Sequence, residues 1–424
     1  MAIGPSVLFI TTEYYPMYNG GLGMLIKHAV EELIDQGAKV TVLVPQVPKS
    51  TKLPINIVNL HKNIKSFLSN PKDIPGLDFG IDTFISTKSK HRKPWPRLYS
   101  NVKSQPKLPV LYPNNMPAVA KALAWAVDKY LSENPNFDLV IAPDWFSIPT
   151  FVLLKETKPR LPFIFYINAT ELDRAVDLSR IGATGKVIFD LEKRFYKEAD
   201  GVIAISDLSR TSLEQDFEVS QSKLTAVYND VNFVPVKESY KAIKNGKNVM
   251  FLGRVERQKG LSFLVQTAMR VNQIDPSIKF IIAGDGDQLP NVVDSVVEQE
   301  MEKQFIFTGW LDSKQKAKLY RSVALFVMPS PREPFGLTPF EAIRSGVPVI
   351  SSNTSGFTSV IKSTPTFNYH DVDGFAQLII HYINNTEDAK ELLKLQSKEL
   401  KEHSWSDQVK HLLEFCGTTI NNKS

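Results

Sequence analysis

Hydrophobic and polar positions follow a repeating order along the chain: a short apolar run, a turn, and an amphipathic stretch. Residues 7–10 form an apolar run that predicts a buried strand. Apolar residues at helical spacing follow from Leu22 to Leu33, and Gly37 predicts the end of that helix. Residues 39–44 form the next apolar run. This strand–helix–strand order predicts a parallel sheet with helices on both faces.

The same order restarts in the second half of the chain. Further strands are predicted for residues 249–253, 279–284, 305–308, 324–328 and 347–351. We therefore expect an α/β protein with two doubly wound units in tandem, whose ligand sites lie at the carboxyl ends of the strands. If the two sets of strand ends face each other, the cleft between the units is the site.

The borders of these units follow from the polar and turn-rich stretch over residues 228–247. We expect an N-terminal domain over residues 1–235 and a C-terminal domain over residues 245–395. The charged helical stretch from about residue 390, with Trp405 near its end, either completes the C-terminal domain or crosses back. We expect residues 396–424 to pack back toward the N-terminal domain.

Length and composition agree with two globular domains. A chain of 424 residues exceeds one ordinary core, and 43% hydrophobic with 22% charged residues is typical of globular proteins. The single cysteine, Cys416, excludes an internal disulfide framework and a cysteine-rich metal site. No signal peptide and no run of about 20 apolar residues is evident, so we expect a cytoplasmic protein.

The net charge of +5 is unevenly distributed. No Asp or Glu occurs over residues 83–127, and this stretch holds several Lys and Arg residues interleaved with Trp95 and Tyr99. One interpretation is a solvated loop. The other is a contact surface over residues 86–107 for a polymer or a membrane headgroup. Nucleic acid is not expected, because no nucleic-acid-binding motif accompanies the patch.

The first chemical motif lies between the first strand and the first helix, where Gly20, Gly21 and Gly23 occur. Glycine amides at a helix N-terminus can approach a phosphate closely. Their spacing differs from the dinucleotide-binding fingerprint. A tight turn into the helix is the alternative interpretation.

The second motif is the glycine-bounded loop over residues 253–260, directly after a predicted strand. It carries two cations, Arg254 and Lys259. A nucleoside diphosphate gains negative charge as it leaves a sugar, and cations placed there stabilise the transition state. An exposed basic loop is the alternative.

The third motif covers residues 330–341. Thr338 is the predicted N-cap of a helix with Pro339 in its first turn, so Glu341 could be a capping-box glutamate. Glu333 lies earlier, in a loop rich in proline and glycine, and is expected to point into the cleft. The amides of Gly336, Leu337 and Thr338 form a second candidate phosphate cradle.

The two glutamates also raise the question of a hydrolase. Retaining glycosidases place two carboxyl groups about 5–5.5 Å apart. Eight residues of helix would separate Glu333 from Glu341 by about 12 Å. Two separate binding roles fit that spacing better than a catalytic pair.

Together these motifs resemble one family, the retaining glycosyltransferases of the glycogen/starch synthase and sucrose synthase-like type (glycosyltransferase families 4 and 5). Its members share an architecture of two Rossmann-like domains, called GT-B, and a pair of glutamates eight residues apart. The similarity runs over nearly the whole chain. It includes residues 12–23, 143–145, 168–174, 253–254, 259–260, 283–286 and 333–341.

The resemblance implies roles for matching residues. It implies that Arg254 and Lys259 clamp the diphosphate, that Glu333 binds the donor sugar, and that Glu341 binds the ribose. It also implies further contacts to the donor or the acceptor, from Gly20, Gly21, Asp144, Asn168, Glu171, Gly336, Leu337 and Thr338.

The implied reaction transfers a hexose, with retention, from a nucleotide-diphosphate sugar to a glucan, small-sugar or lipid acceptor. The nucleotide could be ADP, UDP or GDP. No cofactor and no metal are expected, and we assign no Asp-x-Asp metal site.

Asn168 departs from the family pattern, because close relatives carry a histidine there. Pro143 likewise stands where relatives often have histidine. Asn168 can donate and accept hydrogen bonds but cannot carry a proton. Two alternatives therefore stay open: a catalytically weak regulator that binds a sugar nucleotide or glucan, and a nucleotide-sugar isomerase of the same fold.

Overall fold

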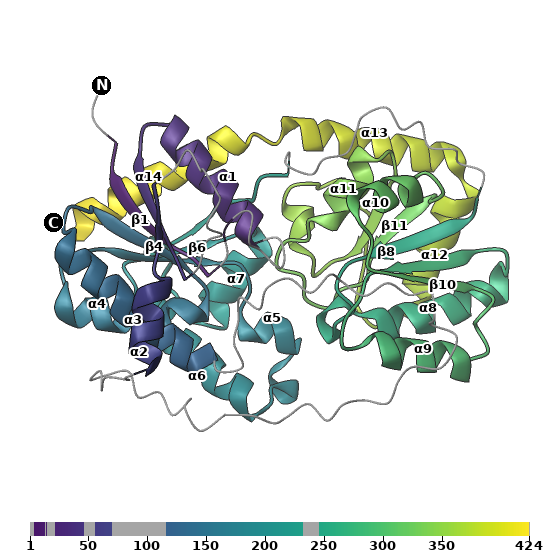
Figure 1. Ribbon diagram of the computed structural model, residues 1–424. Coiled ribbons are helices and arrows are strands. Elements are labelled where there is room, and N and C mark those ends of the chain that lie inside the picture. Colours follow the sequence, from purple (N-terminus) through teal and green to yellow (C-terminus); the bar gives the residue numbers. More distant parts are fainter. Residues whose placement is uncertain are drawn as a thin grey trace.

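The computed structural model describes residues 4–12, 14, 22–45, 56–69, 116–231 and 246–423. Within these residues the chain forms two lobes, each built on one parallel sheet (Figure 1). The strand order is β3-β2-β1-β4-β5-β6-β7 in the N-terminal lobe and β10-β9-β8-β11-β12-β13 in the C-terminal lobe. The predicted α/β fold of two Rossmann-like units is therefore confirmed.

The strands of the N-terminal lobe are short and apolar. They are β1 (Ser6–Ile10), β2 (Lys39–Val44), β3 (Asn56–Asn59), β4 (Leu139–Pro143), β5 (Phe163–Ile167), β6 (Gly201–Ala204) and β7 (Leu224–Ala226). Its helices are α1 (Leu22–Asp35), α2 (His61–Ser69), α3 (Met116–Glu133), α4 (Ile148–Thr157), α5 (Glu171–Ala175), α6 (Ala183–Glu198) and α7 (Asp207–Gln215). In the described part of this lobe, 3-10 turns occur at η3 (Trp145–Ser147), η4 (Leu178–Arg180) and η5 (Gln221–Lys223).

Strand β1 shows why both faces of this sheet are covered. Its side chains alternate: Val7 and Phe9 join a buried cluster with residues of α1, whereas Leu8 and Ile10 join one with residues of α2 and α3. Because all four are apolar, neither face can be left in water, and helices pack on both. The predicted helix and its end are also confirmed, since α1 is followed by Gly37 at φ +98°.

The C-terminal lobe repeats the arrangement. Its strands are β8 (Asn248–Leu252), β9 (Lys279–Ala283), β10 (Phe305–Gly309), β11 (Leu325–Met328), β12 (Val349–Ser352) and β13 (Thr366–Phe367). Its helices are α8 (Leu261–Ile274), α9 (Leu289–Glu298), α10 (Ser313–Tyr320), α11 (Thr338–Arg344), α12 (Val372–Asn384) and α13 (Thr386–Glu402). The described 3-10 turns of this lobe are η6 (Arg257–Lys259), within the loop that follows β8, and η7 (Gly356–Ser359), which follows β12.

The chain ends in two helices rather than one. α13 stays on the C-terminal lobe, where the Gln396 side chain bonds the backbone of Val349. Trp405 begins α14 (Trp405–Lys423) instead of lying near the end of a helix, and its indole Nε1 donates to the carbonyl oxygen of His28 in α1, at 3.4 Å. α14 therefore packs on the N-terminal lobe, where the yellow ribbon of Figure 1 runs behind α1.

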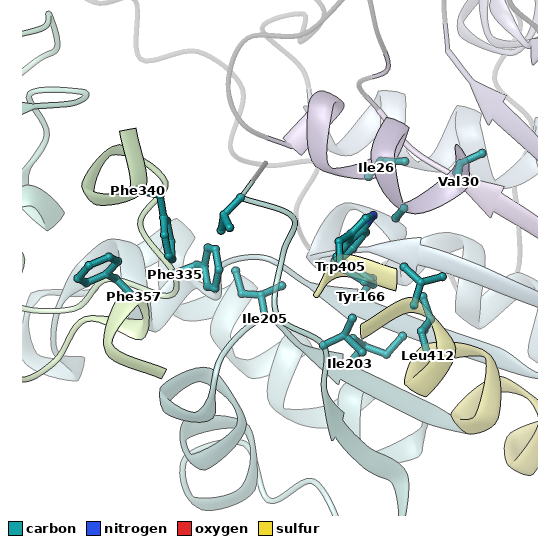
Figure 2. Close-up of a cluster of buried hydrophobic side chains, with 14 of the residues drawn as sticks. Ile26, Val30, Tyr166, Ile203, Ile205, Phe335, Phe340, Phe357, Trp405 and Leu412 are labelled. Atoms are coloured by element: carbon teal, nitrogen blue, oxygen red, sulfur yellow. The ribbon is translucent and has the colours of Figure 1, made fainter. Parts of the chain in front are cut away.

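One buried apolar cluster spans both lobes. Figure 2 shows Ile203 and Ile205 of the N-terminal lobe in the same cluster as Phe335, Phe340 and Phe357 of the C-terminal lobe. Removal of this shared apolar surface from water stabilises contact between the lobes.

Several predicted features lie outside the described residues: the glycines Gly20 and Gly21, the basic stretch over residues 86–107, and most of the linker after residue 231. Among the helices that the structure describes, none has the length and apolar character needed to cross a membrane.

Candidate active site

A cavity of about 900 Å³ lies between the lobes. Its walls include residues at the carboxyl ends of strands in both sheets, as expected for this fold. The predicted site residues that line it are Asp144, Asn168, Arg254, Lys259, Glu333, Gly336, Leu337 and Thr338. Glu171 and Glu341 are not among the lining residues.

Lys259 reaches the cavity from the turn after β8. It ends η6, and Gly260 follows at φ +68°, a conformation that favours glycine. A Cβ on Gly260 would stand 2.0 Å from the carbonyl oxygen of Pro329, so only glycine allows the loop of residues 329–331 to come this close. This approach brings the loop that carries Glu333 against the loop that carries Lys259.

Lys259 and Glu333 form a largely buried ion pair. Lys259 Nζ lies 2.5 Å from Glu333 Oε2, and the two side chains are 15% and 7% exposed. Ser330 Oγ donates to the same carboxylate oxygen at 3.3 Å. The Glu333 backbone is held by hydrogen bonds with Thr354 and Gly356. These contacts fix Glu333 at the wall of the cavity, where the loop was expected to direct it.

Arg254 lines the same cavity as this pair, but its own ion pair is more exposed. Its Nη1 lies 2.7 Å from Glu256 Oε1, and the Arg254 side chain is 64% exposed. Exposed pairs of this kind contribute about 0–1 kcal/mol to stability. An incoming anion can therefore replace Glu256 as the partner of Arg254 at little cost.

Asp144 and Asn168 form the N-terminal wall. Asp144 has φ +49°, an uncommon conformation for a residue other than glycine. Its Oδ1 accepts hydrogen bonds from the amides of Asn168 at 2.7 Å and Ala169 at 3.3 Å. Burial nevertheless raises the pKa of Asp144 to about 6, although Arg174 and these amides favour the charged form.

The Asn168 side chain is only partly satisfied. Its Nδ2 donates to the carbonyl oxygen of Tyr166 at 3.2 Å. Its Oδ1 is buried and has no hydrogen-bond partner among the residues that the structure describes. A buried acceptor without a partner is costly, so this oxygen is a candidate contact for a ligand hydroxyl.

Sequence reasoning missed a buried polar network behind this wall. Glu192 of α6 is fully buried, and its carboxylate accepts from the amide of Glu171 at 2.9 Å. Burial raises the pKa of Glu192 well above its ordinary value, although Arg174 opposes the shift. The Glu171 side chain pairs with Arg174, at 3.4 Å, rather than lining the cavity. One signal was available: Glu192 lies between Phe189 and Phe195 at helical spacing, a charge on an apolar face.

Glu341 does not cap α11, so the capping-box alternative is wrong. The N-cap is Leu337, which moves Glu341 one position beyond the one that a capping glutamate occupies. Lys316 of α10 binds the carboxylate of Glu341 instead, at 2.9 and 3.2 Å. The two glutamates thus have different lysine partners, which supports separate roles and argues against a hydrolase pair.

Comparisons with known proteins show which proteins the chain resembles in sequence and in fold. The chain is 23% identical over 372 residues to the glycogen synthase of Mycobacterium tuberculosis, covering 85% of this chain and 81% of that one. Its fold is similar to the sucrose-phosphate synthase of Thermosynechococcus elongatus, with a TM-score of 0.70, 16% identity, and coverage of 96% and 97% of the two chains. It is also similar to the catalytic domain of Arabidopsis thaliana starch synthase IV bound to ADP and acarbose, with a TM-score of 0.64, 14% identity, and coverage of 99% and 100%.

Two family descriptions divide the chain between them. Residues 236–398 match the family described as "Glycosyl transferases group 1". Residues 19–233 match the family described as "Glycosyltransferase Family 4". Because the second match spans more than half of the chain and both halves agree, the protein belongs to the family 4 glycosyltransferases and has the GT-B fold.

Proposed function

We propose that this glycosyltransferase transfers a hexose, most simply glucose, from a nucleotide-diphosphate sugar to a glucan, small-sugar or lipid-linked acceptor, with retention at the anomeric carbon. One observation carries the proposal. The buried Lys259–Glu333 pair and the hydrogen-bonding Asp144–Asn168 wall line one cavity between the lobes.

The C-terminal wall suits a diphosphate leaving group. Arg254 exchanges Glu256 for a phosphate oxygen, and the ammonium of Lys259 lies within the same cavity wall. Negative charge on the leaving phosphate grows as the glycosidic bond breaks. Cations held in place before the reaction stabilise that charge without reorganising. Glu333 then has the role of binding the sugar beside this charge.

The N-terminal wall suits a sugar. The unpaired Oδ1 of Asn168 can accept a hydrogen bond from a hydroxyl group. The carboxyl of Asp144 is held in place by the backbone amides of Asn168 itself and of Ala169. We propose no cofactor and no metal for the reaction, and a chelator added to the assay tests the second point.

Asn168 also favours a second candidate, a catalytically weak protein that binds a sugar nucleotide or glucan as a regulator. The family resemblance places histidine at that position, and asparagine cannot carry a proton. The two candidates differ in turnover rather than in binding.

The experiment is a panel of ADP-, UDP- and GDP-hexoses with purified protein. Thermal shift first identifies the nucleotide that raises the melting temperature. Released nucleotide is then assayed with glucan, maltose or glycolipid present, with and without EDTA, and the anomeric configuration of the product is read by NMR. Transfer that Lys259→Ala abolishes supports the proposal. If the protein binds a donor but releases no nucleotide with any donor and acceptor, the result supports the second candidate, the regulator.

A further inference from the structure

Arg332, the residue before Glu333, reaches out of its own lobe. Its Nε donates to Asp173 Oδ1 at 3.1 Å. Its Nη2 donates to Ser212 Oγ at 2.6 Å and to Asp216 Oδ2 at 2.9 Å. All three partners belong to the N-terminal lobe, on or beside α5 and α7. One guanidinium thus bridges two helices across the boundary between the lobes.

The partners of Arg332 are themselves held rigidly. Asp173 is buried and closes a capping box with Thr170 at the start of α5, the helix that follows the Asn168 segment. Ser212 Oγ donates to Asp216 Oδ2 at 2.8 Å. The Arg332 side chain is 24% exposed, so this contact is shielded more than an ordinary surface pair. Because the guanidinium of Arg332 is planar and bonds two carboxylates, it restricts the relative orientation of the two lobes as well as the distance between them.

The residue after Glu333 is bound to the same lobe. The carbonyl oxygen of Pro334 accepts from Ser206 Oγ at 2.6 Å and from Ser209 Oγ at 3.3 Å. The fit is close, because a Cβ on Gly356 would stand 2.0 Å from that carbonyl oxygen and 2.6 Å from Ser206 Oγ. The neighbouring Ile205 and Phe335 share the buried apolar cluster seen in Figure 2.

Glu333 therefore sits between two contacts to the opposite lobe while its side chain binds Lys259 of its own lobe. Arg332 and Pro334 set the position of its backbone, and Lys259 sets the direction of its carboxylate. Any separation of the lobes pulls on the segment that carries Glu333.

We propose that Arg332 is a positioning residue, which holds the lobes closed through Asp173 and Asp216 and thereby fixes Glu333 for sugar transfer. The expected effect of Arg332 on turnover rests on the proposed function. The expectation that Arg332 holds the lobes closed does not. A displacement of about 1 Å at a reacting centre can cost about 100-fold in rate. Loss of the contact should thus lower kcat and leave the affinity for the nucleotide nearly unchanged.

The test measures lobe separation and turnover in the same variants. Spin labels are placed at two exposed positions by Asp190→Cys in α6 and Asp294→Cys in α9, on different lobes, and the buried Cys416 stays unlabelled. The distance distribution between labels is recorded for the parent protein, Arg332→Met, Arg332→Lys and Asp216→Asn. Arg270→Met is the matched control, because Arg270 pairs with Asp373 within the C-terminal lobe. The unlabelled variants are assayed for kcat and for the dissociation constant of the nucleoside diphosphate identified by thermal shift.

For Arg332→Met we expect a longer or broader label distance and a kcat lowered by about 10- to 100-fold, with a dissociation constant within about threefold of the parent value. Arg332→Lys should recover part of kcat, because lysine keeps the charge but cannot bind both carboxylates as a fork. Asp216→Asn, at a partly exposed site, should show the same changes to a smaller degree if Arg332→Met does not fold.

A parent-like distance distribution in Arg332→Met and Asp216→Asn would overturn the proposal, and so would a parent-like kcat in both. Changes of equal size in Arg270→Met would overturn it too. If the parent protein transfers no sugar, the proposed function fails, and the label distance still decides whether Arg332 holds the lobes together.

Discussion

Lys259 and Glu333 lie 74 residues apart in the chain, yet their charged atoms meet at 2.5 Å in the wall of the cavity between the lobes. The pair is largely removed from water, so each charge depends on the other. A substitution at either position therefore changes both the stability of the protein and the charge offered to a ligand.

For Lys259→Ala we expect turnover to fall by orders of magnitude, because the departing diphosphate loses a cation. The free energy of unfolding should also fall, by about 3–5 kcal/mol, because Glu333 is left buried without its partner. Urea unfolding and kcat measure the two effects separately. Lys394→Ala, in an exposed pair with Glu391, should cost less than about 1 kcal/mol. Full turnover in a folded Lys259→Ala protein would rule out the clamp.

For Asn168→His we expect a change in turnover or in acceptor choice, because an imidazole can carry a proton where the amide cannot. Asn168→Ala is the companion variant. It removes the unpaired Oδ1, and if that oxygen binds a substrate hydroxyl, kcat/KM should fall by about 10- to 100-fold. Parent-like kinetics and acceptor choice in both variants would place this segment away from the reacting sugar.

Asp144 should make the protein less stable as pH rises from 3.8 to about 6. Below this window the carboxyl is protonated in both the folded and the unfolded chain. Within the window the unfolded chain loses the proton first, because burial raises the folded pKa, so the folded state holds more protons and its stability falls with pH. The resulting loss in the free energy of unfolding is up to about 3 kcal/mol and is complete above the folded pKa of about 6.

Urea unfolding of the parent protein and Asp144→Asn at pH 4 and pH 7 tests this. The parent should lose stability relative to the variant at the higher pH. The opposite order would mean that the amides of Asn168 and Ala169, rather than burial, dominate the pKa of Asp144.

For Glu341→Gln we expect weaker binding of the nucleotide sugar with a smaller effect on kcat. A hydrogen bond to a charged group contributes about 1.5–3 kcal/mol, so KM should rise by roughly 10- to 100-fold if the carboxylate binds the ribose. Lys316→Met separates the structural contribution, since Lys316 is the cation bound to Glu341. Equal losses of donor affinity in the two variants would point to the ion pair rather than to the carboxylate itself.

Much of the fold could be predicted from the sequence because it depends on local periodicity. Apolar runs of strand length recur between amphipathic stretches, and β1, β8 and β9 form where these runs lie. The rule that parallel sheets bind ligands at strand ends also placed the loops of Arg254 and Glu333 at a cleft. These inferences needed neither contacts between distant residues nor side-chain directions.

The direction of individual side chains was decided by packing between distant segments. Glu341 could have been a capping-box glutamate, but Leu337 is the N-cap of α11 and Lys316 of α10 binds the carboxylate. Glu171, which belongs to one of the motifs that resemble the family, pairs with Arg174 and does not line the cavity. No local pattern predicts the Lys316 partner of Glu341, because Lys316 lies on another element, whereas Arg174 is only three residues from Glu171 in α5.

The sequence by itself determined that two Rossmann-like units would place cations and glutamates beside one cleft, since the motifs sit in the loops that follow apolar runs. Only the tertiary structure decided which charges meet. Arg332 appears in the sequence as one more basic residue in a loop, and its role follows from Asp173 and Asp216, more than 100 positions away, on the opposite lobe. Charges act over a few ångströms, and distances of that size are set by the folded chain rather than by sequence order.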